Sequence, residues 1–314
     1  MRNTTRTPLS DRGVRMHATA RPLALRRLTE GLAPYALALP ALALMALFVY
    51  GVGIGVLQGF GIAPFLDRFD FTLEYFREAF TRSDFTSSLC FSLFVSLMSS
   101  LIALGGGILL SAALVKAKSG SFTQLLGLQI PIMSMHALVA LGFIFLLSGS
   151  GLLARALYVV GIVGSPNDLP SIVGAPSGWG IILVYAWKEI PYVAFCTIAI
   201  MSHVSDSLGE AAATCGAAPV RSFFSVTLPL SLTASLKAFL VVFAFSFGAY
   251  EIPFLLGPTA PKALPILAYL EFQDPDILNR FYAMAINGIV TLVCALAALV
   301  YFLVLKHERK EGGR

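Results

Sequence analysis

Residues 210–229, EAAATCGAAPVRSFFSVTLP, interrupt a chain that is otherwise strongly apolar. A Ser-x-x-Glu spacing that begins at Ser207 is typical of a helix start, and Gly216 favours a helix stop or a sharp bend. Pro219 suits the first turn of a second helix, because the N–H that proline lacks would be unpaired there anyway. The stretch therefore predicts two short helices joined by a bend, with Pro229 resetting the backbone where the next apolar run begins.

The sequence on either side of this interruption has the composition of a membrane protein. Of its 314 residues, 57% are hydrophobic and only 12% are charged, whereas soluble proteins carry about 25% charged residues. Transmembrane β-strands show shorter, alternating segments. Apolar runs long enough to cross a hydrocarbon core of ~30 Å as helices lie at about 33–57, 87–115, 122–148, 178–202, 232–257 and 280–305. The sequence therefore predicts an all-α membrane protein with six transmembrane helices.

The distribution of positive charge predicts the orientation of these helices. Six spans place both termini on the same side, and Lys and Arg are retained in the cytoplasm. With both termini inside, the cytoplasmic segments hold fifteen Lys and Arg residues and the outer segments hold six. A basic tail, residues 1–32, contributes seven arginines. We therefore interpret the net charge of +5 as a topology signal rather than a nucleic-acid surface. The interruption, within 203–231, is expected in the cytoplasm between spans four and five.

The spacing of small, aliphatic and proline residues in the interruption resembles a known family motif. It is similar to the EAA loop in permease subunits of binding-protein-dependent type I ABC importers, although that family prefers isoleucine where this chain has valine. The resemblance implies that the loop is a coupling helix that fits a groove on an ATPase subunit. It covers the chain from about the second span to the sixth, and its motif residues are Glu210, Ala211, Ala212, Gly216, Val226, Leu228 and Pro229.

The resemblance also implies the partners of such a subunit. They are a dimer of ABC ATPase subunits, a second permease subunit that is either identical or homologous, and an extracytoplasmic solute-binding protein. The chain has no G-x-x-x-x-G-K-[ST] phosphate loop, so ATP and Mg are expected on the partner ATPase. Residues 33–314 are then a non-catalytic, six-span permease domain in the inner membrane of a bacterium, in contact with lipid, with no cofactor and no metal site. The glycines at 105–107 are interpreted as a helix-packing site.

Charged residues within the apolar runs mark a candidate translocation path. Ionisable side chains are costly inside a membrane and usually face water or a partner. They occur here in YAWKEIPYVAF, as Lys188 and Glu189, and in FGAYEIPFLLG, as Glu251. On a helix the two adjacent charges are ~100° apart, so they need not pair with each other. One interpretation is that these three line a path together with Tyr192 and Tyr250. The alternative is that they brace helix packing or lie near an interface.

The transported solute is less constrained by the sequence. Residues 247–272 resemble the corresponding region of spermidine/putrescine-type permeases, whose relatives also import thiamine, ferric iron or aminophosphonates. Nine acidic residues in the outer segments favour a cationic, polyamine-like solute, or else face a docked binding protein or reflect topology. A different class of protein, an ion-gradient-driven secondary transporter, usually has repeats and unwound segments at mid-membrane. It is kept as the alternative function.

Overall fold

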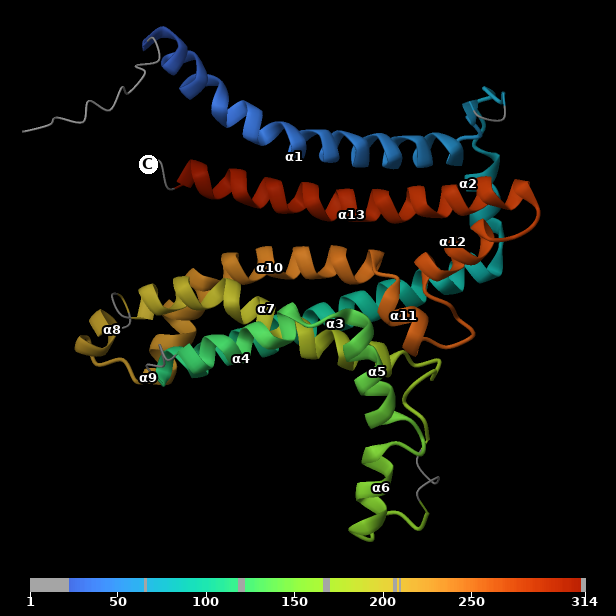
Figure 1. The fold of residues 1–314 in the computed structure, drawn as a ribbon. Coiled ribbons are helices and arrows are strands. Elements are labelled where there is room, and N and C mark those ends of the chain that lie inside the picture. The colour runs from blue at the N-terminus through green and yellow to red at the C-terminus, as the bar shows by residue number, and fades with distance from the viewer. Residues whose placement is uncertain are drawn as a thin grey trace, which may run out of the picture. The chain divides into compact units, whose positions relative to one another are not determined.

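The computed structural model describes residues 23–64, 67–117, 122–165, 170–205, 208 and 210–311. Within these ranges the chain is helical and has no strand, apart from an isolated bridge between Ala63 and Arg68. The chain divides into two compact units, Met1–Gly53 and Ile54–Arg314. The helices are α1 (Leu23–Gly59), α2 (Glu74–Thr81), α3 (Ser83–Lys116), α4 (Phe122–Met133), α5 (His136–Leu147), α6 (Leu152–Val159), α7 (Trp179–Val204), α8 (Glu210–Thr214), α9 (Pro219–Ser222), α10 (Leu228–Gly248), α11 (Glu251–Leu256), α12 (Leu264–Phe272) and α13 (Ile277–Glu311) (Figure 1).

In the part of the chain that the structure describes, six helical segments are long and apolar enough to cross a membrane, which agrees with the predicted number. They are Leu37–Gly59, Ser83–Lys116, His136–Val159, Trp179–Val204, Val220–Gly248 and Ile277–Lys306. Residues 1–22 of the predicted basic tail lie outside the described residues, and residues 23–32 already belong to α1. The predicted boundary at 32/33 is therefore not a boundary of the helix.

The third predicted span, 122–148, is not one continuous helix. It consists of α4 and α5, which are separated by a break at Ser134 and Met135. Met135 has extended backbone angles, and the Ser134 hydroxyl donates to the Pro131 carbonyl at 2.7 Å. A proline within a helix removes a backbone hydrogen bond and kinks the chain. Pro131 and the local bonding of Ser134 therefore account for the helix ending shortly afterwards.

The fifth predicted span, 232–257, is also divided. The helix α10 ends at Gly248, Ala249 is extended, and α11 begins at Glu251. In a continuous helix the ring of Pro253 would clash with the Ala249 carbonyl four residues earlier. In the first turn of a new helix, the missing N–H of Pro253 costs nothing. Proline placement therefore ends the span about nine residues before the predicted limit.

The core of the unit Ile54–Arg314 is the packing of α3 along α7, with α10 against both. Gly107 makes this close approach possible, because a Cβ there would lie 2.6 Å from the Val193 side chain. A Cβ on Gly106 would lie 2.9 Å from Ile190. The predicted packing role is confirmed for these two glycines, whereas Gly105 faces open space.

Buried hydroxyl groups join the same helices. The Ser111 hydroxyl on α3 lies within hydrogen-bond distance of the Ala194 carbonyl on α7, at 3.2 Å. The hydroxyls of Thr197 and Ser235 lie 3.2 Å apart, between α7 and α10. All three hydroxyls also lie within hydrogen-bond distance of the carbonyl four residues earlier in their own helix, so each has a partner without water. The arrangement suits an interior from which water is excluded.

Candidate functional site

Two regions of the unit Ile54–Arg314 contain the residues singled out in the sequence. The first, here called the loop surface, comprises the described residues of 208–229 and lies at one end of α7 and α10 (Figure 1). The second, here called the polar junction, surrounds the breaks at 134–135 and 249–250. The helices α11 and α12 lie toward the opposite end from α8 and α9 (Figure 1).

The loop surface begins with α8 and a tight C-terminal cap. Gly216 has a φ of +82°, and the Ala217 N–H donates to the Ala212 carbonyl at 3.0 Å. A residue with left-handed backbone angles, followed by an N–H that donates to the carbonyl five residues earlier, is a Schellman motif. This motif ends a helix and turns the chain. The predicted bend at Gly216 is confirmed. Ser207, the first residue of the predicted capping box, lies outside the described residues.

The second half of the loop surface joins the membrane helix without interruption. The helix α9 starts at Pro219, as predicted, and a π-helical turn, Phe223–Thr227, leads into α10. The Leu228 N–H donates to the Phe223 carbonyl, five residues back. The prediction that Pro229 resets the backbone is therefore wrong. A π turn changes the hydrogen-bond register, so the helix passes a proline in the first turn of α10 without breaking.

Apolar side chains are exposed on the loop surface. Val220 is 69% exposed and Phe224 61% exposed, and Leu208, Cys215 and the charged Arg221 are also exposed. The rings of Phe223 and Phe224 meet edge to face at 5.2 Å. The loop surface therefore exposes both apolar and charged side chains.

The predicted motif residues fall into two groups. Those of the first group belong to α8 and its cap, where Ala211 and Gly216 are exposed and Ala212 is half-buried. In the second group, Val226 and Leu228 are half-buried in the helical stem and Pro229 is exposed. Glu210 is the first residue of α8.

The polar junction forms where the two helix breaks meet. The helix α5 packs against α11, and each begins with an ionisable residue. His136 Nδ1 lies 3.9 Å from Glu251 Oε2. The Glu251 side chain is 63% exposed. His136 was not among the predicted path residues, because its position at a helix start depends on a break that the apolar run 122–148 conceals.

Lys188 and Glu189 lie on α7 beside this junction and point to different neighbours. The Lys188 ammonium donates to the Ser134 carbonyl at 2.5 Å. The Glu189 carboxylate accepts a hydrogen bond from the Ser246 hydroxyl on α10. The divergence of the two side chains is confirmed. Both side chains are buried: Lys188 binds the segment between α4 and α5, and Glu189 binds α10, which agrees with the helix-packing interpretation.

The tyrosines of the predicted path are placed differently from one another. Tyr250 stacks on Phe254 at 5.0 Å and meets Tyr269 at 5.1 Å, next to the exposed Glu251. Tyr192 is half-buried and packs against a separate cluster that includes Val193. The structure therefore brings Tyr250 and Glu251 together and leaves Tyr192 in another environment.

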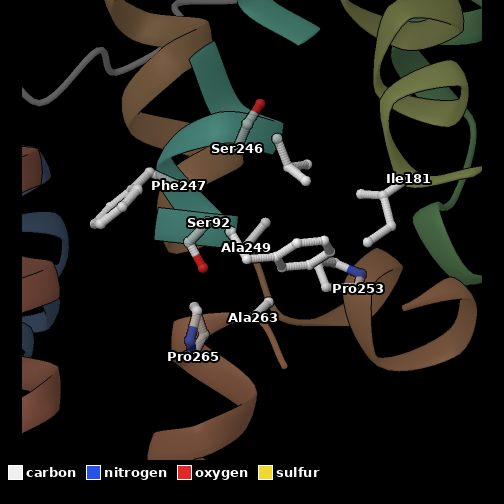
Figure 2. Close-up of a pocket in the computed structure, with 10 residues that line it drawn as sticks. Ser92, Ile181, Ser246, Phe247, Ala249, Pro253, Ala263 and Pro265 are labelled. Carbon is white, nitrogen blue, oxygen red and sulfur yellow. The ribbon is translucent and has the colours of Figure 1, made fainter. Parts of the chain in front are cut away.

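A small cavity lies where α3, α7 and the segment 246–265 meet. Its volume is about 10 Å³, and it is lined by Ser92, Ile181, Ser246 and Pro253 among others. Figure 2 shows the Ser92 hydroxyl directed toward the segment that carries Ala263 and Pro265, and this oxygen accepts the Leu264 N–H at 2.7 Å. A space of this size holds one water molecule at most. It is a packing feature and not a solute site.

Comparison with known proteins shows a consistent set of relatives, although no family model matches the chain. The chain is 25% identical over 297 residues to the probable ABC transporter permease protein YurN of Bacillus subtilis, covering 88% of this chain and 97% of YurN. It is 29% identical over 222 residues to the glycerol-3-phosphate transport system permease protein UgpA of Yersinia pseudotuberculosis, covering 68% and 73%. The maltose/maltodextrin permease protein MalF of Escherichia coli is 30% identical over 128 residues, covering 40% of this chain and only 25% of MalF.

Solved structures support the same fold. A chain of a bacterial alginate ABC transporter, in complex with an alginate-bound periplasmic protein, aligns with a TM-score of 0.68 at 18% identity. The alignment covers 90% of this chain and 98% of that one. A second structure of a transporter that imports alginate aligns with a TM-score of 0.65 at 17% identity, covering 92% and 99%.

These relatives correct one expectation from the sequence. They belong to maltose, glycerol-phosphate and other ABC systems, not to the spermidine/putrescine type that residues 247–272 were taken to resemble. Polyamine transport therefore has no support. Over most of its length, the chain is a multi-span membrane protein with the fold and the sequence relatives of ABC transporter permease proteins.

Proposed function

We propose that this chain is the permease subunit of a binding-protein-dependent ABC importer, and that it couples ATP hydrolysis on a partner to solute passage. The observation that carries the proposal is the loop surface. It combines exposed apolar residues with the EAA spacing and a Schellman bend at its glycine. The names of the relatives agree with this function.

The geometry of the loop surface suits mechanical coupling. The helix α9, the π turn and α10 form one uninterrupted helical segment from Pro219 to Gly248. A push on α9 is therefore transmitted along the helix axis into the membrane. The helix α8, from Glu210 through Ala211 and Ala212, and the bend at Gly216 present the docking face. The half-buried Val226 and Leu228 and the neighbouring Pro229 form the stem.

The proposed orientation places the loop surface in the cytoplasm of a bacterium, at its inner membrane. There it would meet a dimer of ATPase subunits that hold ATP and Mg. In Figure 1 the C-terminal end of α13 lies at the same end as α8 and α9, which supports a cytoplasmic C-terminus. A cytoplasmic N-terminus follows from an even number of spans. The binding protein would then dock at the opposite end, near α2, α11 and α12.

The proposed translocation path passes the polar junction. Glu251 and Tyr250 are its solute-facing residues, because Glu251 is exposed and adjoins the stacked ring of Tyr250. Lys188 and Glu189 support the path from behind, and Tyr192 lies farther along α7. A second permease subunit, identical or homologous, would complete the path. An ionisable side chain exposed within an apolar face favours water or protein as its neighbour over lipid.

The proposed solute is polyhydroxylated, as in the maltose and glycerol-phosphate systems of the relatives. Aromatic rings beside a carboxylate suit such a solute, because the rings contact its C–H faces and the carboxylate accepts from its hydroxyl groups.

Co-purification tests the proposal directly. The C-terminally tagged chain is extracted from native membranes in several mild detergents, and the proteins that accompany it are identified by mass spectrometry. We expect an ABC ATPase and a permease subunit, and the genes of that ATPase lead to a binding protein whose ligand is then identified. Recovery of the chain alone in every detergent would contradict the proposal and favour transport driven by an ion gradient.

A further inference from the structure

We infer that Lys188 is a positioning residue of the proposed path: its ammonium group fixes the break between α4 and α5 and does not contact the solute. This role rests on the proposed function, because the break between α4 and α5 belongs to the proposed translocation path. The contact itself is a property of this chain alone, so it can be tested without the partners.

The chemistry of the break explains why a cation is needed. The helix α4 ends at Met133, and the Ser134 N–H still donates to the Ile130 carbonyl at 3.1 Å. The next helix begins its own bonds when the Val139 N–H donates to the Met135 carbonyl at 3.1 Å. The Ser134 carbonyl lies between the two helical ladders. In an apolar interior such a group must find another donor.

Lys188 supplies this donor from α7, 54 residues away in sequence. Its neighbour along the chain, Glu189, is turned toward Ser246 on α10 and does not neutralise it. The consecutive residues therefore hold two different elements, the α4–α5 break and the end of α10. A buried ammonium group is costly unless it is paired or hydrogen-bonded, and here the acceptor is a backbone carbonyl that cannot be lost by side-chain substitution.

Burial separates the role of Lys188 from that of Glu251. Lys188 is only 7% exposed, whereas the Glu251 side chain is mostly exposed. A residue that contacts a passing solute must be reachable. The break held by Lys188 immediately precedes His136, the first residue of α5, which faces Glu251. Lys188 therefore acts on the path through the position of His136.

The test measures how easily the break opens. The four cysteines, Cys90, Cys196, Cys215 and Cys294, are replaced, and one reporter cysteine is introduced as Ala140→Cys, because Ala140 on α5 is fully buried and becomes reachable only when the break opens. A matched control carries Ala283→Cys on α13, since Ala283 is also fully buried. The full chain is labelled in native membranes with a water-soluble maleimide, in the presence of Lys188 or of the variants Lys188→Met and Lys188→Arg.

The expected result is specific to the break. Lys188→Met should speed labelling at position 140 about tenfold, because a hydrogen bond from a charged donor is lost. Lys188→Arg retains a donor and should remain within about twofold of the parent. Labelling at position 283 should not change in either variant. An unchanged rate at position 140 in Lys188→Met, or equal acceleration at both positions, overturns the inference. Absence of an ATPase in the co-purification would contradict the proposed function and leave this result standing.

Discussion

At the loop surface, backbone and side chains are arranged by neighbours in the sequence, whereas at the polar junction they are arranged by distant segments. The Schellman bond joins Ala217 to Ala212. At the junction, Lys188 reaches Ser134 across 54 residues and Glu189 reaches Ser246 across 57. The loop surface exposes apolar groups such as Val220 and Phe224, whereas the junction buries Lys188 and Glu189 and exposes Glu251. Under the proposed function, the first region contacts a partner, whereas the second holds together helices whose backbone hydrogen bonds are interrupted.

The largest effect is expected at Gly216, where the local design depends on one backbone angle. A Cβ there would meet no atom within 4 Å, so only the φ of +82° requires glycine. Gly216→Val should abolish solute-stimulated ATP hydrolysis by the co-purified complex, because a β-branched residue is a genuine outlier at positive φ. The chain should still insert in the membrane. Gly216→Asn, which tolerates this angle, should retain part of the stimulation, and Gly142→Ala should retain all of it. Undiminished stimulation in Gly216→Val would remove the docking role.

The next largest effect is expected from substituting Glu189 at the polar junction. It should lower the thermal stability of the protein and is not a test of coupling to an ATPase. Glu189→Ala leaves the Ser246 hydroxyl without its acceptor and opens space beside it, which should cost about 1–3 kcal/mol. For a chain of this size that corresponds to a fall in Tm of about 5 °C, measured by thermal unfolding in detergent. Glu189→Gln keeps an acceptor oxygen and should lose less. A Tm unaffected by Glu189→Ala would mean that the junction is not braced by this contact.

A smaller effect is expected from trimming the apolar face of the loop surface. Phe224→Ala should weaken binding of the ATPase subunit about tenfold, as is common for a central aromatic residue of an interface, without lowering Tm. The matched control is Phe145→Ala on α5, since Phe145 is also strongly exposed. Titration of the purified ATPase against the labelled chain in nanodiscs measures both. If the ATPase bound the Phe224→Ala and parent proteins with equal affinity, the proposed partner contact at the loop surface would be contradicted.

The smallest effect is expected at the N-terminal end of α3, where Arg82 forms a partly exposed ion pair. Arg82 lies 2.5 Å from Glu78 and 3.7 Å from Glu271, and its guanidinium lies over the Tyr282 ring at 4.1 Å. Burial raises the pKa of Glu271 despite the nearby Arg82. The folded state therefore holds the proton more tightly, so this group favours folding below its ordinary pKa and loses that contribution as the pH rises through the folded value.

Glu271→Gln removes this titration. It should flatten a decline in Tm with rising pH by about 1–2 °C, since exposed pairs contribute under about 1 kcal/mol. Thermal unfolding between acidic and neutral pH measures the slope. An identical slope in the variant would assign the decline to another group.

The sequence predicted the loop surface more completely than the junction, for physical reasons. Gly216 and Pro219 act through rules that involve a few residues, so the bend and the start of α9 followed from the spacing. The π turn did not, because its hydrogen-bond register depends on how α10 packs. At the junction, Lys188 and Glu189 were singled out as costly charges, but their acceptors lie on helices that only the fold brings near. The apolar run 122–148 carried no marker of its break beyond Pro131.

The π turn at Phe223–Thr227 determines how the side chains of α9 are rotated around the helix axis relative to those of α10. Each residue of an α-helix advances the chain by about 100° around the axis, and a π turn accommodates a residue more than an α turn does. The exposed face of α9, which carries Val220, and the face of α10 that packs on α3 and α7 are thus offset from each other around the helix axis. Deleting one residue within this turn would rotate Phe224 and Val220 by about that angle relative to the span, so that the same side chains, equally exposed, would face a different direction.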